Sequence, residues 1–158
     1  MKPDLVKCHD IDGKSYEVDS NSLEFRPAVY GVAVDHQSVL LSPQWDGYDY
    51  TGGGVKLGER LADALKREFW EETGYQVELG PLLHVNDSFF KLPFSGRFVH
   101  SIHIFYQCQI VGGELSSRHL DQHEQQYVSQ AEWVELSTID HIVFKNSADN
   151  RQVLSSFI

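Results

Sequence analysis

The chain has 158 residues, of which 41% are hydrophobic and 23% charged, so it is long enough for one domain and is neither fibrous nor disordered in composition. A formal net charge of −10 argues against stable binding to nucleic acid. The longest apolar runs, such as residues 28–34, are too short to span a bilayer, and the N-terminus lacks the apolar segment of a secretory signal. We therefore expect a cytoplasmic protein with no membrane partner, whose two cysteines, Cys8 and Cys108, are buried or reduced.

The first third of the chain is expected to form strands and turns. A peripheral hairpin is predicted at about residues 5–18, because two strand-like segments flank Asp12 and Gly13, a pair favoured in two-residue type I′ turns. In residues 28–41, β-formers at a period of two predict two strands joined by a turn at residues 35–38. Both faces of the first of these strands are apolar, so we expect it to be central in its sheet.

A loop followed by an amphipathic helix is predicted next. The segment at residues 42–51 is rich in turn formers and aromatic residues, and it leads into three glycines at residues 52–54. Glycines let the backbone approach a ligand closely, although a plain turn explains them as well. The helix is expected from about Gly58 to Thr73, ended by Gly74. Its core-facing stripe comprises Leu61, Ala62, Leu65 and Phe69.

Three glutamates lie on one side of this helix. Glu68, Glu71 and Glu72 are spaced i, i+3 and i+4, and Arg67 lies four residues before Glu71, where it can orient or partly neutralise that side chain. Like charges at this spacing repel one another, which indicates a divalent cation as the missing partner. Trp70 projects from the polar side of the helix. Another segment or a second subunit in a homodimer could cover it, and a singly exposed aromatic residue is the plain alternative.

Strands dominate the rest of the chain. The segments YQVEL, PLLHV, RFVHSIHIFYQCQIV and EWVEL are expected to be strands separated by turns, and the tail at residues 147–158 has apolar residues at the spacing of a closing helix. His100 and His103 differ by an odd number within one strand, so they point to opposite faces. This spacing argues against joint metal binding by the two histidines.

The region around the glutamates also contains a longer pattern with fixed spacing, made of Gly53, Glu59, Arg67, Glu68, Glu71, Glu72 and Gly74. This pattern resembles the Nudix box of the Nudix (MutT-like) hydrolase family, with Phe69 and Tyr75 where bulky aliphatic residues are usual. The resemblance implies an α/β fold in which a mixed β-sheet is sandwiched between the box helix and a C-terminal helix, with residues 1–158 as one domain. It also implies a structural role for Glu59.

The activity that this resemblance implies is hydrolysis of a pyrophosphate bond in a nucleotide-derived small molecule, with Mg²⁺ or Mn²⁺ as the cofactor. Mg²⁺ prefers oxygen ligands from one or two carboxylates, waters and phosphates, which fits the residues at hand. A nucleoside triphosphate is the first expectation for the substrate, followed by a nucleotide sugar or ADP-ribose. The alternative is a Nudix domain that binds a nucleotide as a sensor without cleaving it.

Roles for individual residues also follow from the resemblance. Glu71 and Glu72 are implied to be the principal metal ligands, and Glu68 a further ligand or the group that activates water. The carbonyl of Gly52 is implied to bind metal, and Arg67 to position the carboxylates. Glu68, Arg67 and Glu72 are therefore candidate catalytic residues.

One further acidic residue, a ligand or a base, is implied in a loop after the later strands. Glu124 is our candidate, with Asp121 and Glu132 as competitors, and a solvated loop charge is the plain alternative.

The substrate-binding residues are sought among aromatic side chains that could stack on a base. Tyr48, Tyr50 and Phe89 are our candidates, together with the nearby Trp45 and Phe90. All five could equally be core or rim residues.

Overall fold

The computed structural model describes residue 2 and residues 4–158. Its strands are β1 (Leu5–His9), β2 (Ser15–Asp19), β3 (Glu24–Asp35), β4 (Ser38–Gln44), β5 (Gly47–Asp49), β6 (Thr51–Gly54), β7 (Tyr75–Lys91), β8 (Phe98–Gly113) and β9 (Glu132–Glu135). The described residues also form two α-helices, α1 (Leu61–Thr73) and α2 (Asn150–Val153). There are three 3₁₀ turns among them, η1 (Ser20–Ser22), η2 (Glu124–Gln126) and η3 (Leu136–His141).

The sheet is mixed, and β3 lies near its centre. The strand order is β2, β1, β7, β8, β3, β4, β5, with β6 paired to β3 and β9 paired to β4. Strand β3 is parallel to β8 and antiparallel to β4 and β6, and β7 is antiparallel to β8. Residues 28–33 of β3 are all buried, so its central position is confirmed. Its apolar side chains on both faces explain this position, since both faces are covered.

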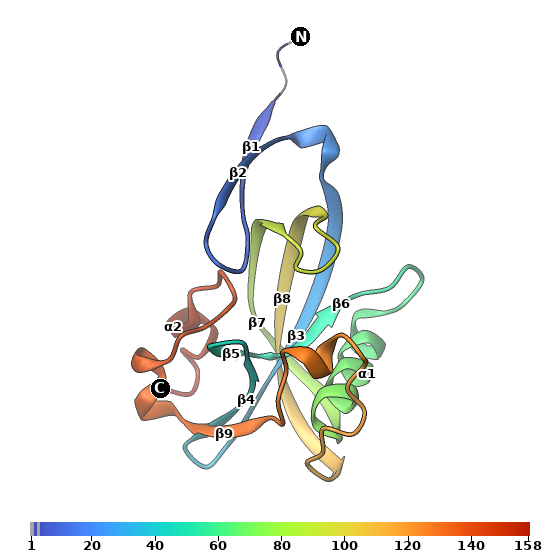
Figure 1. Ribbon diagram of the computed structural model, residues 1–158. Helices are drawn as coiled ribbons and strands as arrows, with labels where there is room; N and C mark the ends of the chain where they lie inside the picture. Colours follow the sequence, from blue (N-terminus) through green and yellow to red (C-terminus); the bar gives the residue numbers. More distant parts are fainter. Residues whose placement is uncertain (1, 3) are drawn as a thin grey trace.

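Two apolar clusters lie on opposite faces of the sheet. On one face, Leu65 and Phe69 of α1 pack with Val29 of β3. On the other face, Phe105 of β8 packs with Val153 near the C-terminus. Figure 1 shows the sheet running between α1 on one side and the segment that contains α2 on the other. This confirms the expected α/β arrangement, a mixed sheet between the box helix and the C-terminal segment.

The C-terminal helix is much shorter than expected. Instead of a helix through residues 147–158, α2 has four residues, Asn150–Val153, whose first N–H groups are capped by the carboxylate of Asp149. The turns that follow keep Leu154 fully buried and Phe157 half-buried against the same core. The apolar spacing therefore reports burial of these residues correctly, although the segment is not one continuous helix.

Residues 42–54 are not the loop that turn formers and glycines suggested. Strands β5 and β6 occupy most of this segment, and Gly52 to Gly54 pair with Tyr30 to Ala28 of β3. Packing overrides the weak strand propensity of glycine here. A Cβ placed on Gly53 would lie 2.8 Å from Cδ of Glu68, so only glycine lets helix α1 bring this carboxyl group so close to the strand.

Helix α1 begins at Leu61 rather than at Gly58, because Gly58 has a φ of +79° and belongs to the preceding turn. The helix ends as expected, with Gly74 in the left-handed conformation at a φ of +78°. In the predicted stripe, Leu65 and Phe69 are fully buried. The other two members of the stripe, Leu61 and Ala62, are half-buried.

The N-terminal strands β1 and β2 form an antiparallel pair that projects beyond the rest of the sheet (Figure 1). The connection is longer than a two-residue turn, because His9 pairs with Ser15 and residues 10–14 lie between them. Gly13 has a φ of +82°, and its N–H donates to the carbonyl of Asp10. The side chain of Asp10 accepts two hydrogen bonds from further N–H groups of this turn, which favours the longer connection over a type I′ turn.

The two cysteines are buried, as expected, and are not joined in a disulfide.

Candidate active site

A cavity of about 1100 Å³ opens beside the N-terminal end of β3. Its walls include residues of strands β1, β3, β5, β6, β7 and β8 and of helix α1. Loops complete the walls, among them those that follow β4 and β8 and the one before α2. Because the chain segments that form it are far apart in sequence, the cavity exists only in the folded domain. It is large enough for a nucleotide-sized ligand.

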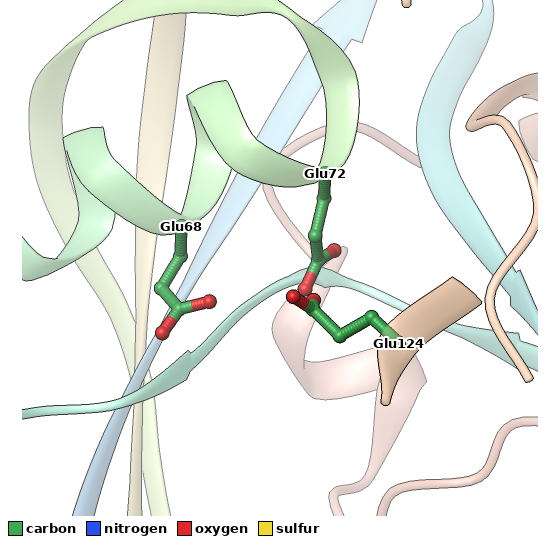
Figure 2. Close-up of side chains that lie close together, drawn as sticks. All are labelled: Glu68, Glu72 and Glu124. Carbon is green, nitrogen blue, oxygen red and sulfur yellow. The ribbon is translucent and has the colours of Figure 1, made fainter. Parts of the chain in front are cut away.

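Three carboxylates meet at one wall of this cavity. Glu68 and Glu72 extend from neighbouring turns of α1, and Glu124 approaches them from the short turn η2 (Figure 2). Each of the three offers an oxygen, and these oxygens lie within 4.8 Å of one another. Hard divalent cations prefer such sets of carboxylate oxygens. The residues therefore fit a cation such as Mg²⁺.

Burial makes negative charge on these three carboxylates unfavourable. Glu72 is only 3% exposed, and the hydroxyl of Ser42 donates a 2.9 Å hydrogen bond to its Oε2. Loss of solvent, followed by the negative charges of Glu68 and Glu124, raises the pKa of Glu72 well above its ordinary value. Burial is also the main cause that raises the pKa of Glu124 to about 7 and increases the pKa of Glu68. A bound cation would compensate this concentration of negative charge.

Arg67 joins the cluster to the turn before the helix. Its Nε lies 2.7 Å from Oε1 of Glu59, and its Nη1 lies 2.7 Å from Oε1 of Glu68. Its Nη2 donates to the carbonyl of Gly54, and a longer contact of 3.5 Å reaches Glu71. The hydrogen bond to Arg67 is the main cause that lowers the pKa of Glu59 to about 2. This network fixes the direction of the Glu68 side chain.

Glu124 is held by a local capping arrangement. The carboxylate of Asp121 accepts the N–H groups of His123 and Glu124, which starts the turn η2 and aims Glu124 toward the helix. Glu132 is directed elsewhere, because its Oε2 accepts a hydrogen bond from the hydroxyl of Tyr48. Of the three loop acids considered, Glu124 alone belongs to the carboxylate cluster found in the described residues.

Two other expected metal ligands, Glu71 and the carbonyl of Gly52, belong to the same cavity as the cluster. Glu71 lines the cavity and contacts Arg67, but it does not belong to the group of oxygens within 4.8 Å. Gly52 lines the same cavity from strand β6. The structure thus brings the carboxylates of Glu68, Glu72 and Glu124 together, with Glu71 beside them, and the role of the Gly52 carbonyl stays a prediction.

Comparison with known proteins identifies the family. A family model described as NUDIX domain matches residues 24–157, which is most of the chain. The chain belongs to the Nudix family. No curated protein matches the sequence. As a Nudix hydrolase domain, the chain is an enzyme. Within residue 2 and residues 4–158, no helix is long and apolar enough to cross a membrane.

Solved Nudix structures share the fold at low sequence identity. A MutT Nudix hydrolase from Burkholderia pseudomallei is 20% identical with a TM-score of 0.62, over 85% of this chain and 99% of that chain. The E. coli ORF135 protein is 18% identical with a TM-score of 0.61, over 87% and 91% of the two chains. An ADP-ribose pyrophosphatase from Streptococcus suis is 18% identical with a TM-score of 0.53, over 71% and 75%.

The aromatic candidates in this Nudix domain do not all reach the cavity. Tyr50 is fully buried, stacks on Phe144 in the core and lies outside the cavity lining, which does not support the predicted contact with substrate. Tyr48 also lies outside the cavity and packs against that core. Phe89 does line the cavity, as do two neighbouring aromatic residues considered with it, Trp45 and Phe90. Burial on a core face and burial on a ligand face look alike in sequence, so the sequence pattern could not separate these rings.

Several cavity residues of this Nudix domain carry no sequence signal that singled them out. Arg26 of β3 and Asp49 of β5 both line the cavity, as does Asn146 from the loop before α2. Asp49 is 8% exposed, and Asn146 donates a 2.8 Å hydrogen bond to its Oδ1. Burial raises the pKa of Asp49 to about 6. These residues are scattered polar positions near strand ends, and only the fold shows that they face one space.

Trp70 is partly covered by the same chain. Its ring stacks on His119 with 3.8 Å between ring centroids, although the side chain keeps 42% of its exposure. Of the three explanations considered for this residue, contact with another segment therefore holds for one face of its ring. Dimerisation stays a prediction.

Proposed function

We propose that this Nudix domain hydrolyses a pyrophosphate bond in a nucleoside triphosphate, in a reaction that depends on a divalent metal ion. Other nucleoside diphosphate derivatives, such as a nucleotide sugar or ADP-ribose, are the second class of substrate. The observation that carries the proposal is the cluster of Glu68, Glu72 and Glu124 at the wall of a cavity of about 1100 Å³. Phosphate chains and carboxylates repel each other, so a shared cation is required for them to meet.

The proposed metal is Mg²⁺ or Mn²⁺, held by Glu68, Glu72 and Glu124, with Glu71 and the carbonyl of Gly52 as further ligands. When bound, such a cation offsets the phosphate charge, polarises a P–O bond and lowers the pKa of an attacking water. Arg67 keeps the carboxylate of Glu68 in place through its 2.7 Å hydrogen bond. Glu68 is then either a ligand or the group that accepts the proton of the water.

Similarity in fold supports the type of bond that is broken. The neighbours include the ADP-ribose pyrophosphatase and a protein described as UDP-X diphosphatase, which is 17% identical with a TM-score of 0.61 over 85% of this chain and 65% of that chain. The names of both proteins describe cleavage of a diphosphate linkage. We carry only this linkage over to the chain, since the two names differ in the group attached to it.

The experiment is an assay of phosphate and pyrophosphate release from a panel of nucleoside triphosphates, nucleotide sugars and ADP-ribose. Each substrate is incubated with Mg²⁺, with Mn²⁺ and with excess chelator. Turnover of at least one substrate that disappears with chelator is the expected result. Nucleotide binding without turnover of any substrate would contradict the proposal and favour a sensor domain. We further expect a cytoplasmic enzyme that forms no stable complex with nucleic acid.

A further inference from the structure

Arg26 occupies a position in the cavity that the Nudix box does not account for. It lies near the start of β3, its side chain is half-buried, and it lines the cavity from the strand that pairs with the glycine strand β6. A Cβ on Gly53 would touch the carboxylate of Glu68 at 2.8 Å, and a Cβ on Gly54 would lie 3.4 Å from Nη2 of Arg26. Two adjacent glycines therefore leave room for Glu68 and for Arg26.

The guanidinium of Arg26 has few partners. Its Nη1 donates a 3.3 Å hydrogen bond to the hydroxyl of Ser101, and that hydroxyl donates to the backbone carbonyl of Arg26. In the described part of the chain no carboxylate forms an ion pair with it. Three other cations that line the same cavity do have carboxylate partners: Arg67 pairs with Glu59, Arg97 with Glu24 and Lys145 with Asp46. Like Arg26, the lysines Lys7 and Lys56 form no ion pair within the described residues, but neither is placed beside Glu68 by the glycine strand. Within the described residues, the guanidinium of Arg26 therefore contacts only hydroxyl groups, those of Ser101 and Tyr30, and its charge is not balanced by a carboxylate.

The charge of Arg26 acts on the surrounding cavity. It is close enough to Glu68 and Asp49 to oppose the rise in pKa that burial causes at both carboxyls. In the same way it opposes the rise in pKa of Tyr30, whose hydroxyl group lies beside it. A half-buried guanidinium without a counterion, next to the carboxylate cluster, provides a complementary charge for an anionic ligand.

We propose that Arg26 binds the phosphate chain of the substrate, through hydrogen bonds from its guanidinium to non-bridging oxygens of the pyrophosphate group. The planar fork of arginine matches phosphate geometry and can make two parallel hydrogen bonds, which lysine cannot. Ser101 positions this fork from the neighbouring strand β8. The inference rests on the proposed function, because it assigns Arg26 to the same pyrophosphate group.

The test measures binding of methylenediphosphonate, a pyrophosphate analogue that cannot be hydrolysed, by calorimetry with Mg²⁺ present. The variants are Arg26→Gln, Arg26→Lys and, as a control, Arg118→Ala, whose exposed side chain lies outside the cavity. Arg26→Gln is expected to weaken binding by about tenfold or more, because charge-assisted hydrogen bonds are lost. Arg26→Lys is expected to weaken it by a smaller factor, and the control is expected to leave it unchanged.

Two results would overturn the proposal. One is binding to Arg26→Gln within about twofold of the unmodified protein, the range in which an exposed charge acts. The other is absence of binding to the unmodified protein itself. If Arg26→Gln fails to fold, as shown by thermal unfolding without ligand, the comparison of Arg26→Lys with Arg118→Ala decides the question by the same measurement. Equal affinities of these two variants would then overturn the proposal.

The experiments can contradict the proposed hydrolysis and the proposed role of Arg26 independently of each other. If no nucleotide is hydrolysed but Arg26→Gln still loses affinity for methylenediphosphonate, the phosphate contact stands and the proposed hydrolysis falls. If a substrate is hydrolysed and Arg26→Gln has unchanged KM and kcat, hydrolysis stands and the role of Arg26 falls. A merely structural role would lower the unfolding temperature without changing affinity for the analogue, which also contradicts the proposal.

Discussion

Nη1 of Arg67 lies 2.7 Å from Oε1 of Glu68, its immediate neighbour in the chain. Consecutive residues of a helix do not normally face each other, so both side chains must bend toward a common side. The partner that makes this possible is Glu59, which holds the Nε of Arg67 at 2.7 Å from the turn before the helix. The direction of the Glu68 carboxylate therefore depends on a residue outside helix α1.

We predict that Arg67→Ala destabilises the domain by about 1–3 kcal/mol, because Glu59 and Glu68 would stay buried without their cation. Both carboxylates are at most 15% exposed, so solvent compensates little. The control is Arg97→Ala, whose ion pair with Glu24 is exposed and should contribute less than about 1 kcal/mol. Urea unfolding of both variants checks this, and equal losses of stability would contradict the prediction.

Glu72→Gln should lower kcat by orders of magnitude while the domain stays folded. The substitution removes a buried negative charge but keeps an oxygen that can accept the hydrogen bond from Ser42. It therefore separates loss of metal binding from loss of structure. Turnover is measured with a substrate from the panel, and folding by circular dichroism. Near-normal turnover in this variant would remove Glu72 from the proposed ligands.

Metal affinity should distinguish Glu124 from the other loop acids. Glu124→Gln is expected to weaken Mn²⁺ binding, because the variant removes one carboxylate from the cluster. Glu132→Gln serves as the matched control, since Glu132 contacts Tyr48 and lies outside the cluster. Titration followed by electron paramagnetic resonance measures the two affinities directly. A larger loss in Glu132→Gln than in Glu124→Gln would reverse the assignment.

Asp49 makes the stability of the domain depend on pH. Its pKa is raised from 3.8 to about 6 by burial, so the folded state binds a proton more tightly than the unfolded state. The contribution of Asp49 to stability is therefore largest below pH 4 and falls as the pH rises toward 6, by up to about 3 kcal/mol. Other buried carboxyls add to the same trend, so the comparison needs a matched variant.

Asp49→Asn is that variant. Its amide oxygen can accept the same hydrogen bonds from Asn146 and from the N–H of Tyr50. We expect it to be more stable than the unmodified protein at pH 7, with the difference shrinking as the pH falls to 4. Chemical denaturation across this range measures the difference, and a pH-independent offset would show that the Asp49 carboxyl does not titrate as described.

Tyr50→Phe tests the placement of Tyr50 in the core. The hydroxyl of Tyr50 is buried and has no hydrogen-bond partner, so its removal should leave stability unchanged or raise it by up to about 1 kcal/mol. Activity should also be unchanged, because the ring stays packed on Phe144. Thermal unfolding and steady-state kinetics provide both readouts. A raised KM would instead return Tyr50 to the substrate site.

The parts of the fold and site that sequence patterns predicted are those fixed by local spacing. The end of α1 at Gly74, the burial of Leu65 and Phe69, and the convergence of Glu68 with Glu72 all follow from helix periodicity. The family resemblance implies one more acidic residue after the later strands, and the fold places the carboxylate of Glu124, rather than that of Asp121 or Glu132, in the cluster.

Long-range packing decided what local patterns left open. The glycines at residues 52–54 suggest a loop because glycine weakens isolated strands. In the structure they form a strand, and the close approach of Glu68 leaves no room for a side chain at Gly53. The stretch of aromatic residues before them could not reveal which rings face the core and which face the cavity. Arg26 and Asp49 gave no local signal, since only sheet pairing brings their strands to one space.

The short turn η2 has a consequence for when the site forms during folding. Glu124 comes from a segment about 50 residues after Glu72, across the whole β7 and β8 hairpin. A peptide with only the helix and its glycine strand would lack this carboxylate and the capping of Asp121 that aims it. Tight metal binding should therefore report completed folding of the domain, since the last ligand arrives only when distant strands have paired.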